Sequence, residues 1–163
     1  MRLLFLRHGI AEDVSPDGTD YSRRLTAEGI ESMQTEAAGM ARLNLKVELI
    51  LASPLVRAAQ TADIVALALG LRSRLREEMR LGLGFSLHHL KTIVGAYSDT
   101  RTLMLVGHEP GMSTVVGQLI GCADVEMKKG SLAIVDALEA EAGAGCLVML
   151  APPALLRRAG GDP

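Results

Sequence analysis

Short apolar runs alternate along this chain with segments whose apolar residues recur at helical spacing. Residues 3–6, 47–52 and 102–106 are runs of this kind, and their brevity is typical of strands buried on both faces. Strands that alternate with helices predict a parallel sheet with helices packed against both of its faces. We therefore expect an α/β fold: a single-domain, three-layer sandwich with a mostly parallel central sheet.

Capping signals place the helices between these runs. Thr26 is a candidate N-cap for a first helix, and Ser53 followed by Pro54 predicts the start of a second. The second helix should end near residue 69, because Gly70 is a typical residue just past a helix end. A weaker strand is expected over residues 71–77. Further helices are expected over residues 87–97 and 112–120, and further strands over residues 131–138 and 146–150.

The composition favours an ordinary soluble domain without polyanionic partners. The net charge of −2 offers no basic field for nucleic acid, and an aromatic content of 2% without Trp leaves few rings for base stacking. No apolar run reaches the roughly 20 residues that span a bilayer, and the run after Met1 is too short for a secretion signal. We expect a cytoplasmic monomer, with one domain over residues 1–151, a loosely ordered tail over residues 152–163, and neither nucleic acid nor membrane as partner.

The two cysteines, Cys122 and Cys146, show no C-x-x-C spacing and have no nearby histidine for a zinc site. A domain of this size folds without a crosslink, so two reduced and mostly buried thiols are expected. A disulfide between them is the alternative that the sequence leaves open.

Cations and imidazoles follow the expected strands at the points where these strands end. Arg7 and His8 end the first strand, Arg57 lies in the first helical turn after the second, and His108 follows the strand near residue 105. The carboxyl ends of parallel strands meet at one rim of a sheet, where ligands bind in α/β folds. Four such groups would repel one another without an anion between them, so the pattern indicates an oxyanion site.

A phosphoryl group fits this set of side chains. Arg7 and Arg57 can each donate paired hydrogen bonds to its oxygens, at roughly 1.5–3 kcal/mol for each charge-assisted bond. The imidazole of His8 keeps a lone pair at neutral pH and can attack phosphorus, giving a covalent phosphohistidine that water then hydrolyses. His108 would donate to a nonbridging oxygen. Gly9 leaves room for close approach and a backbone N–H beside the phosphate, and no metal or other cofactor is needed.

The motifs that carry these residues, in this order, resemble those of the histidine phosphatase (phosphoglycerate mutase-like) superfamily. Arg7 and His8 occupy the family's arginine–histidine motif. Arg57 matches its second arginine and His108 its second histidine. The resemblance covers residues 2–150 and rests on Arg-His-Gly at 7–9, Arg-Arg-Leu-Thr-Ala-Glu-Gly at 23–29, Ser-Pro-Leu-Val-Arg-Ala-Ala-Gln-Thr-Ala at 53–62 and Gly-His-Glu-Pro at 107–110.

Within that family the short length and the segment 20–26 look closest to the SixA-type phosphohistidine phosphatases. This resemblance implies removal of phosphate from a histidine of a signalling protein. Larger members carry insertions over the active site, and the span between Leu75 and Thr102 is too short for a large one. An uncovered site suits a bulky protein substrate.

The general acid is less clearly marked than the phosphate-binding residues. Many relatives place a Glu near the strand end before residue 80, where Glu78 fits loosely, and Asp20 on the loop after His8 is the other candidate. Arg23 could bind substrate phosphate or pair with the acidic loop. An imidazole leaving group needs less help from an acid than an alcohol, which favours the phosphohistidine interpretation.

Three functions are therefore compared. The first is a metal-independent phosphohistidine phosphatase acting through His8. The second is a phosphomonoesterase or mutase for small sugar phosphates or nucleotides, and the third is a phosphate-binding module without turnover. The expected partner is accordingly a phosphorylated protein or a small phosphorylated substrate.

Overall fold

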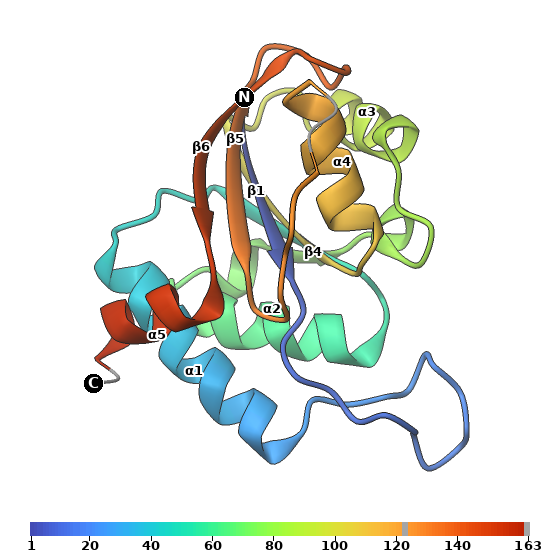
Figure 1. The fold of residues 1–163 in the computed structure, drawn as a ribbon, viewed down its shortest axis with the longest axis vertical. Helices are drawn as coiled ribbons and strands as arrows, with labels where there is room; N and C mark the ends of the chain where they lie inside the picture. Colours follow the sequence, from blue (N-terminus) through green and yellow to red (C-terminus); the bar gives the residue numbers. More distant parts are fainter. Residues whose placement is uncertain (122–123, 162–163) are drawn as a thin grey trace.

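A six-stranded sheet forms the centre of the computed structural model, which describes residues 1–121 and 124–161 (Figure 1). Its strand order is β3-β2-β4-β1-β5-β6. The first four of these strands run parallel, β5 runs antiparallel to β1, and β6 runs antiparallel to β5. The predicted mostly parallel sheet is confirmed. The strands are β1 (Arg2–Arg7), β2 (Leu49–Ala52), β3 (Leu75–Glu77), β4 (Thr102–Gly107), β5 (Leu132–Ala137) and β6 (Gly145–Ala151).

Helices cover both faces of the sheet, as the sequence predicts (Figure 1). Successive residues of a strand point to opposite faces, so Leu4 and Leu6 of β1 pack toward α1, α2 and α5. Leu3 and Phe5 pack instead toward α3 and α4. The fold is therefore a three-layer α/β sandwich. The helices are α1 (Ala27–Arg42), α2 (Val56–Ala68), α3 (Leu87–Ala96), α4 (Gly111–Leu119) and α5 (Pro153–Gly160), with short 3-10 helices η1 (Arg72–Arg74) and η2 (Met79–Leu81).

The two predicted helix caps have different outcomes. Thr26 caps α1 as expected, because its side chain accepts a hydrogen bond from the backbone N–H of Gly29 at 2.9 Å. Ser53 does not cap α2, which begins at Val56 after an N-cap residue, Leu55, without a side-chain hydrogen bond. The hydroxyl of Ser53 is bonded to an imidazole instead, as described below. The strand expected over residues 71–77 is shortened to β3, because its first part forms η1.

The C-terminal segment corrects the prediction of a loosely ordered tail over residues 152–163. Residues 153–160 form α5, which packs against α1 and buries Leu156 completely. The two helices approach closely, since a Cβ at Gly39 would lie 2.0 Å from the carbonyl oxygen of Leu156. Pro153 in the first turn and a left-handed Gly161 after the last make this short helix locally favourable. Residues 162 and 163 lie outside the described part.

The cysteine prediction is wrong for Cys146, which is a free thiol exposed on β6 rather than a buried one. It lies on β6, the edge strand of the sheet, and its side chain is exposed. Cys122 lies outside the described residues. Across residues 1–121 and 124–161, no helix combines the length and the apolar character that crossing a bilayer requires.

Candidate active site

The carboxyl ends of β1 and β4 bring two histidines together. The strands are paired in parallel with Arg7 opposite Gly107, and the backbone N–H of His8 donates to the carbonyl of Gly107 at 3.0 Å. His8 and His108 therefore leave adjacent strands at the same rim of the sheet. Their ring centroids are 5.1 Å apart, and both residues are buried. The predicted convergence of the two imidazoles is confirmed.

The hydrogen bonds of His8 define which ring nitrogen carries the proton and which carries the lone pair. Its Nδ1 lies 2.8 Å from the carbonyl oxygen of Gly9, and because a carbonyl only accepts, Nδ1 carries the ring proton. Nε2 consequently holds the lone pair, toward which Nε of Arg57 donates at 3.3 Å. Burial lowers the pKa of His8 to about 3; the bond to Gly9 opposes this shift, while the charges of His108, Arg57 and Arg7 add to it. The ring is neutral at pH 7.

Arg57 connects the nucleophile candidate to the loop that follows it. The residue is only 4% exposed and lies in the first turn of α2, next to the free N–H groups of the helix start. Its Nη1 donates to the backbone carbonyl of Asp20 at 2.7 Å, and its Nη2 to the Asp20 carboxylate at 2.9 Å. The guanidinium therefore connects His8 to the loop through hydrogen bonds on both sides.

His108 is oriented by a side chain rather than by the backbone. Its Nε2 lies 2.8 Å from Oγ of Ser53, a fully buried residue whose Oγ also accepts from the N–H of Leu55 at 3.3 Å. The Ser53 hydroxyl can donate to Nε2 or accept from it, and in the tautomer in which it donates, the ring proton of His108 lies on Nδ1. Burial lowers the pKa of His108 to about 4, and the charge of Arg57 adds to this shift.

Arg7 completes the cationic group at the end of β1. Its Nη1 donates to the carbonyl of Met127 at 2.6 Å, and burial lowers its pKa while the carboxylate of Glu109 opposes that shift. Among the described residues, the buried side-chain atoms without a hydrogen-bond partner include Nε of Arg7 and Nδ1 of His108. Nε of Arg7 can donate, as can Nδ1 of His108 in the tautomer that carries its proton there, and the oxygens of a tetrahedral oxyanion would accept from them.

The structure corrects the role expected of the Gly9 backbone. Its N–H was expected beside the phosphate, but it donates to Oγ1 of Thr61 at 3.1 Å. Thr61 lies one helical turn after Arg57 and its hydroxyl donates in turn to the Arg57 carbonyl at 2.8 Å. The Gly9 N–H thus connects β1 to α2. The sequence motif contained Thr61 but gave no sign of this bond.

The two candidate acids are both paired with arginines. Asp20 bonds Arg57 and, through its other oxygen, Nη1 of Arg23 at 2.7 Å, so Arg23 pairs with the loop. Burial raises the pKa of Asp20, but the bonds from Arg23 and Arg57 outweigh it and hold the pKa below its ordinary value. Glu78 is bonded through both oxygens by Arg80, at 2.6 Å each, which lowers its pKa too. Each carboxyl is therefore ionised at neutral pH.

The two acids differ in their connection to the rim. Asp20 contacts Arg57 directly, whereas in the described part of the chain no hydrogen bond or ion pair joins Glu78 to Arg7, His8, Arg57 or His108. Outside the rim, His88 and His89 lie together on α3, with His88 exposed and His89 half-buried. Within residues 1–121 and 124–161, no three His, Cys, Asp or Glu side chains are grouped to hold a metal ion.

A family profile described as histidine phosphatase superfamily (branch 1) matches residues 3–81, which include Arg7, His8 and Arg57. The chain belongs to this superfamily, and it is a phosphatase of the hydrolase class. An uncharacterised protein of Picosynechococcus sp. is 40% identical over 115 residues, which cover 69% of this chain and 68% of the relative.

Solved structures share the fold over nearly the whole chain. The protein histidine phosphatase SixA in complex with tungstate is similar with a TM-score of 0.85, at 23% identity over 96% of this chain and 99% of the other. The alpha-ribazole phosphatase of Shigella flexneri has a TM-score of 0.71, at 18% identity over 94% and 97% of the two chains. A mycobacterial glucosyl-3-phosphoglycerate phosphatase has a TM-score of 0.69, at 17% identity over 93% and 99%.

Proposed function

We propose that this phosphatase hydrolyses phosphohistidine on a signalling protein, with His8 as the nucleophile and no metal ion. The observation that carries the proposal is the neutral His8 ring, whose Nδ1 is bonded to Gly9 and whose Nε2 lone pair lies beside Arg57. A location in the cytoplasm is part of the same proposal. The second candidate function is hydrolysis of a small phosphomonoester, because two of the similar solved structures are named as phosphatases of small phosphorylated compounds.

The reaction proceeds in two displacements. Nε2 of His8 forms a bond to phosphorus as the bond from phosphorus to the substrate imidazole breaks. The substrate ring leaves as a neutral imidazole once its second nitrogen carries a proton. Water then attacks phosphorus, the bond to Nε2 breaks, a proton passes to solvent, and phosphate leaves with His8 neutral again. Arg7, Arg57 and His108 stabilise the charge on the transferring oxygens in both steps.

The state of the two carboxyls favours an imidazole over an alcohol as leaving group. An alkoxide must be protonated as it departs, and a protonated carboxyl usually supplies that proton. Asp20 and Glu78 are instead held ionised by their arginines. A protonated phosphohistidine needs no such donor, so this site suits a phosphoramidate better than a phosphomonoester.

The surroundings of the rim suit a protein substrate. The link from β3 to α3 comprises residues 78–86 and contains only η2 as a regular element. No segment of the length of a lid is present there to enclose a small metabolite. A histidine on the surface of a second protein could therefore reach the rim.

A panel of substrates tests this proposal. We expect kcat/KM for a histidine phosphotransfer domain, phosphorylated with phosphoramidate, to exceed that for p-nitrophenyl phosphate and glucose 6-phosphate by at least about 100-fold. Fastest turnover of the sugar phosphate would establish the small-substrate alternative. Binding of phosphate without turnover of any compound would establish the phosphate-binding module.

A further inference from the structure

The two edges of the sheet differ in length and charge. β3 forms one edge with three residues, of which Arg76 and Glu77 are exposed and charged. β6 forms the other with seven residues that carry no charge. Short length and charge are two of the usual protections of an edge strand against pairing with another chain, and a bulge is a third. β3 has the first two protections, whereas β6 has only the bulge.

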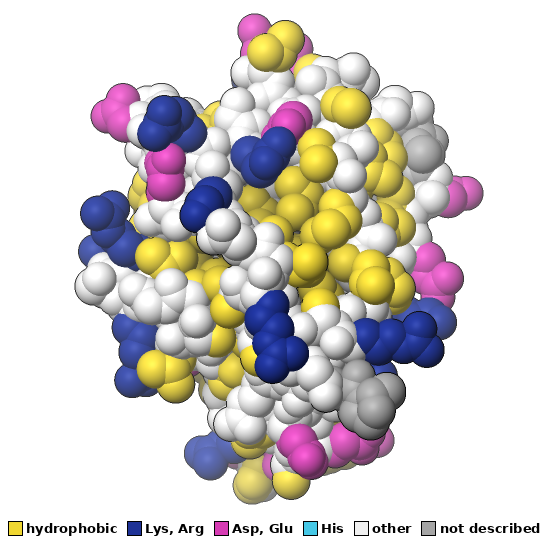
Figure 2. All heavy atoms as spheres, turned by 90° about the vertical axis from the view of Figure 1, so that its left-hand side faces the viewer, with side chains coloured by type: hydrophobic (Ala, Val, Ile, Leu, Met, Phe, Trp, Pro, Cys, Tyr) yellow, Lys and Arg dark blue, Asp and Glu magenta, His cyan; other side chains and the backbone are white. Residues whose placement is uncertain are grey.

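An apolar surface accompanies the free edge of β6. Leu147, Val148 and Leu150 are 37%, 49% and 38% exposed, and Leu155 of α5 is 50% exposed. We call these four residues the β6 patch. Figure 2 shows hydrophobic side chains gathered in a broad area on the side of the molecule where β6 lies, with charged side chains around it. Exposed apolar surface of this kind, beside an unpaired edge, is typical of an interaction site.

We propose that β6 pairs antiparallel with β6 of a second copy of this chain, forming a symmetric dimer with one continuous sheet. A two-fold axis near Val148, the middle residue of the strand, brings identical edges together and buries the β6 patch of both copies. The ladder is short, because Pro152 and Pro153 end it and a bulge interrupts the β5–β6 pairing between Ile134 and Val135. We therefore expect a weak dimer that depends on concentration.

The charges at the two ends of β6 specify a second copy in this orientation. The exposed Glu139 precedes the strand, whereas the exposed Arg158 lies in the last turn of α5 after it. Glu141 and Arg157 are already paired within the chain, with Lys91 and Glu36. The two-fold axis places the acidic end of one copy beside the basic end of the other, twice per dimer. A parallel arrangement would place like charges together. The sequence around β6 is thus complementary to itself only in the antiparallel form.

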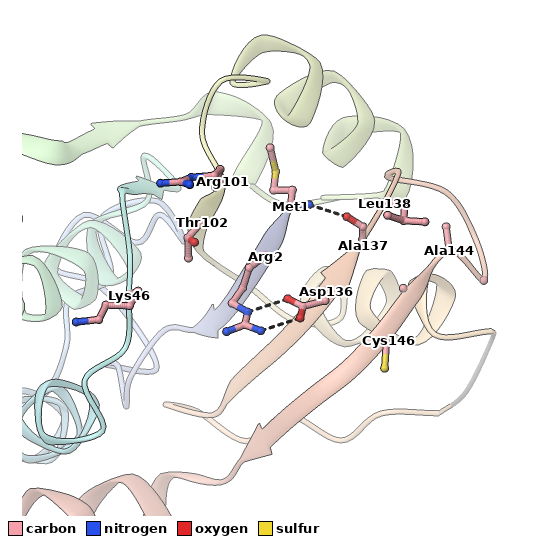
Figure 3. Close-up of a pocket in the computed structure, with 12 residues that line it drawn as sticks. Met1, Arg2, Lys46, Arg101, Thr102, Asp136, Ala137, Leu138, Ala144 and Cys146 are labelled. Carbon is pink, nitrogen blue, oxygen red and sulfur yellow. Dashed lines mark hydrogen bonds and ion pairs between the residues drawn. The ribbon is translucent and has the colours of Figure 1, made fainter.

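A groove also lies at the start of β6. It lies at the amino end of β1, away from the histidines, and Leu138, Ala144 and Cys146 border it (Figure 3). An ion pair closes one side, with Arg2 donating to Asp136 through Nε and Nη2 at 2.7 Å each (Figure 3).

Sedimentation velocity over about 1–300 µM tests the dimer. We expect the mass of the wild type to rise from 17.3 kDa toward twice that value. Val148→Lys introduces the charge that protects natural edge strands, and should weaken association at least about tenfold. Leu67→Lys changes a leucine of α2 that is outside the patch and 62% exposed, and this variant should associate as the wild type does. Circular dichroism checks that each variant is folded.

A charge exchange identifies the orientation. Glu139→Lys should weaken association, and adding Arg158→Glu to the same chain should restore it, because the opposite charges meet again across the axis. Wild-type mass that stays at 17.3 kDa at every concentration would overturn the proposal. So would a Val148→Lys variant that associates as the wild type does. Phosphatase activity should be the same in all these variants, so the outcome is independent of the substrate.

Discussion

The ends of β1 and β4 carry equivalent residues that are held in different ways. His8 is fixed by the carbonyl of Gly9, a backbone group, whereas His108 is fixed by the hydroxyl of Ser53, a side chain. A backbone carbonyl accepts only, so it determines the tautomer of His8 in every variant that keeps the fold. The partner of His108 can donate or accept and can be removed by one substitution. The structure thus fixes the proposed nucleophile more rigidly than its electrostatic partner.

Of the substitutions at these two strand ends, replacing His8 should have the largest effect on activity. His8→Ala removes the lone pair on which both displacements depend, and kcat should fall by at least about 10⁴-fold. Arg7, Arg57 and His108 remain, so inorganic phosphate or tungstate should still bind, measured by calorimetry. Rapid quench with a ³²P-labelled substrate should trap a phosphoenzyme with the wild type and none with His8→Ala. A phosphoenzyme in the variant would remove His8 from its proposed role.

The lowered pKa of His8 should also make the folding stability depend on pH. The folded pKa of about 3 lies below the unfolded value of about 6.5, so the unfolded chain binds the extra proton as pH falls. This contribution is absent near pH 7.5 and destabilises the fold by about 2 kcal/mol at pH 5. Burial raises the pKa of Glu36 to about 7, and the charge of Arg157 opposes this shift. Lowering the pH therefore stabilises the fold at Glu36, whereas it destabilises the fold at His8.

The pH dependence of wild-type stability also contains the contribution of Glu36. The contribution of His8 is therefore measured as the difference in pH dependence between the wild type and His8→Asn. Between pH 7.5 and pH 5, urea unfolding should show the wild type losing about 2 kcal/mol more stability than the variant. His108 and Glu36 contribute to both proteins and cancel in the difference. Equal pH dependence in the two would mean that His8 titrates near its ordinary pKa.

Much of this rim could be predicted from the sequence, because parallel strands end at a common edge. That rule alone brought Arg7, His8, Arg57 and His108 to one place, without any contact being known. The role of Ser53 could not be predicted, since Ser before Pro has the same pattern whether its hydroxyl caps a helix or bonds a distant ring. The Gly9 N–H was also misjudged, because its acceptor Thr61 lies 52 positions away.

The other differences between prediction and structure, at α5 and at Cys146, arise where the local sequence pattern is weak and tertiary contacts determine the structure. The segment after residue 152 has few residues and is flanked by Pro and Gly, so it resembled a tail. Its helix is stabilised by burial of Leu156 against α1, where Gly39 permits close approach. The exposure of Cys146 follows from the position of β6 at the sheet edge, which strand patterns do not specify. The edge of a sheet is a property of topology rather than of any one segment.

The smallest effect should come from the partner of His108. Ser53→Ala keeps the backbone and removes one hydrogen bond, so His108 stays in the rim with a less defined ring orientation. We expect kcat/KM to fall less than about 10-fold, compared with about 100-fold or more for His108→Ala. The two substitutions combined should cost no more than His108→Ala alone, because Ser53 acts only through that ring. An additive loss in the double variant would give Ser53 a contact of its own with the transferring phosphoryl group.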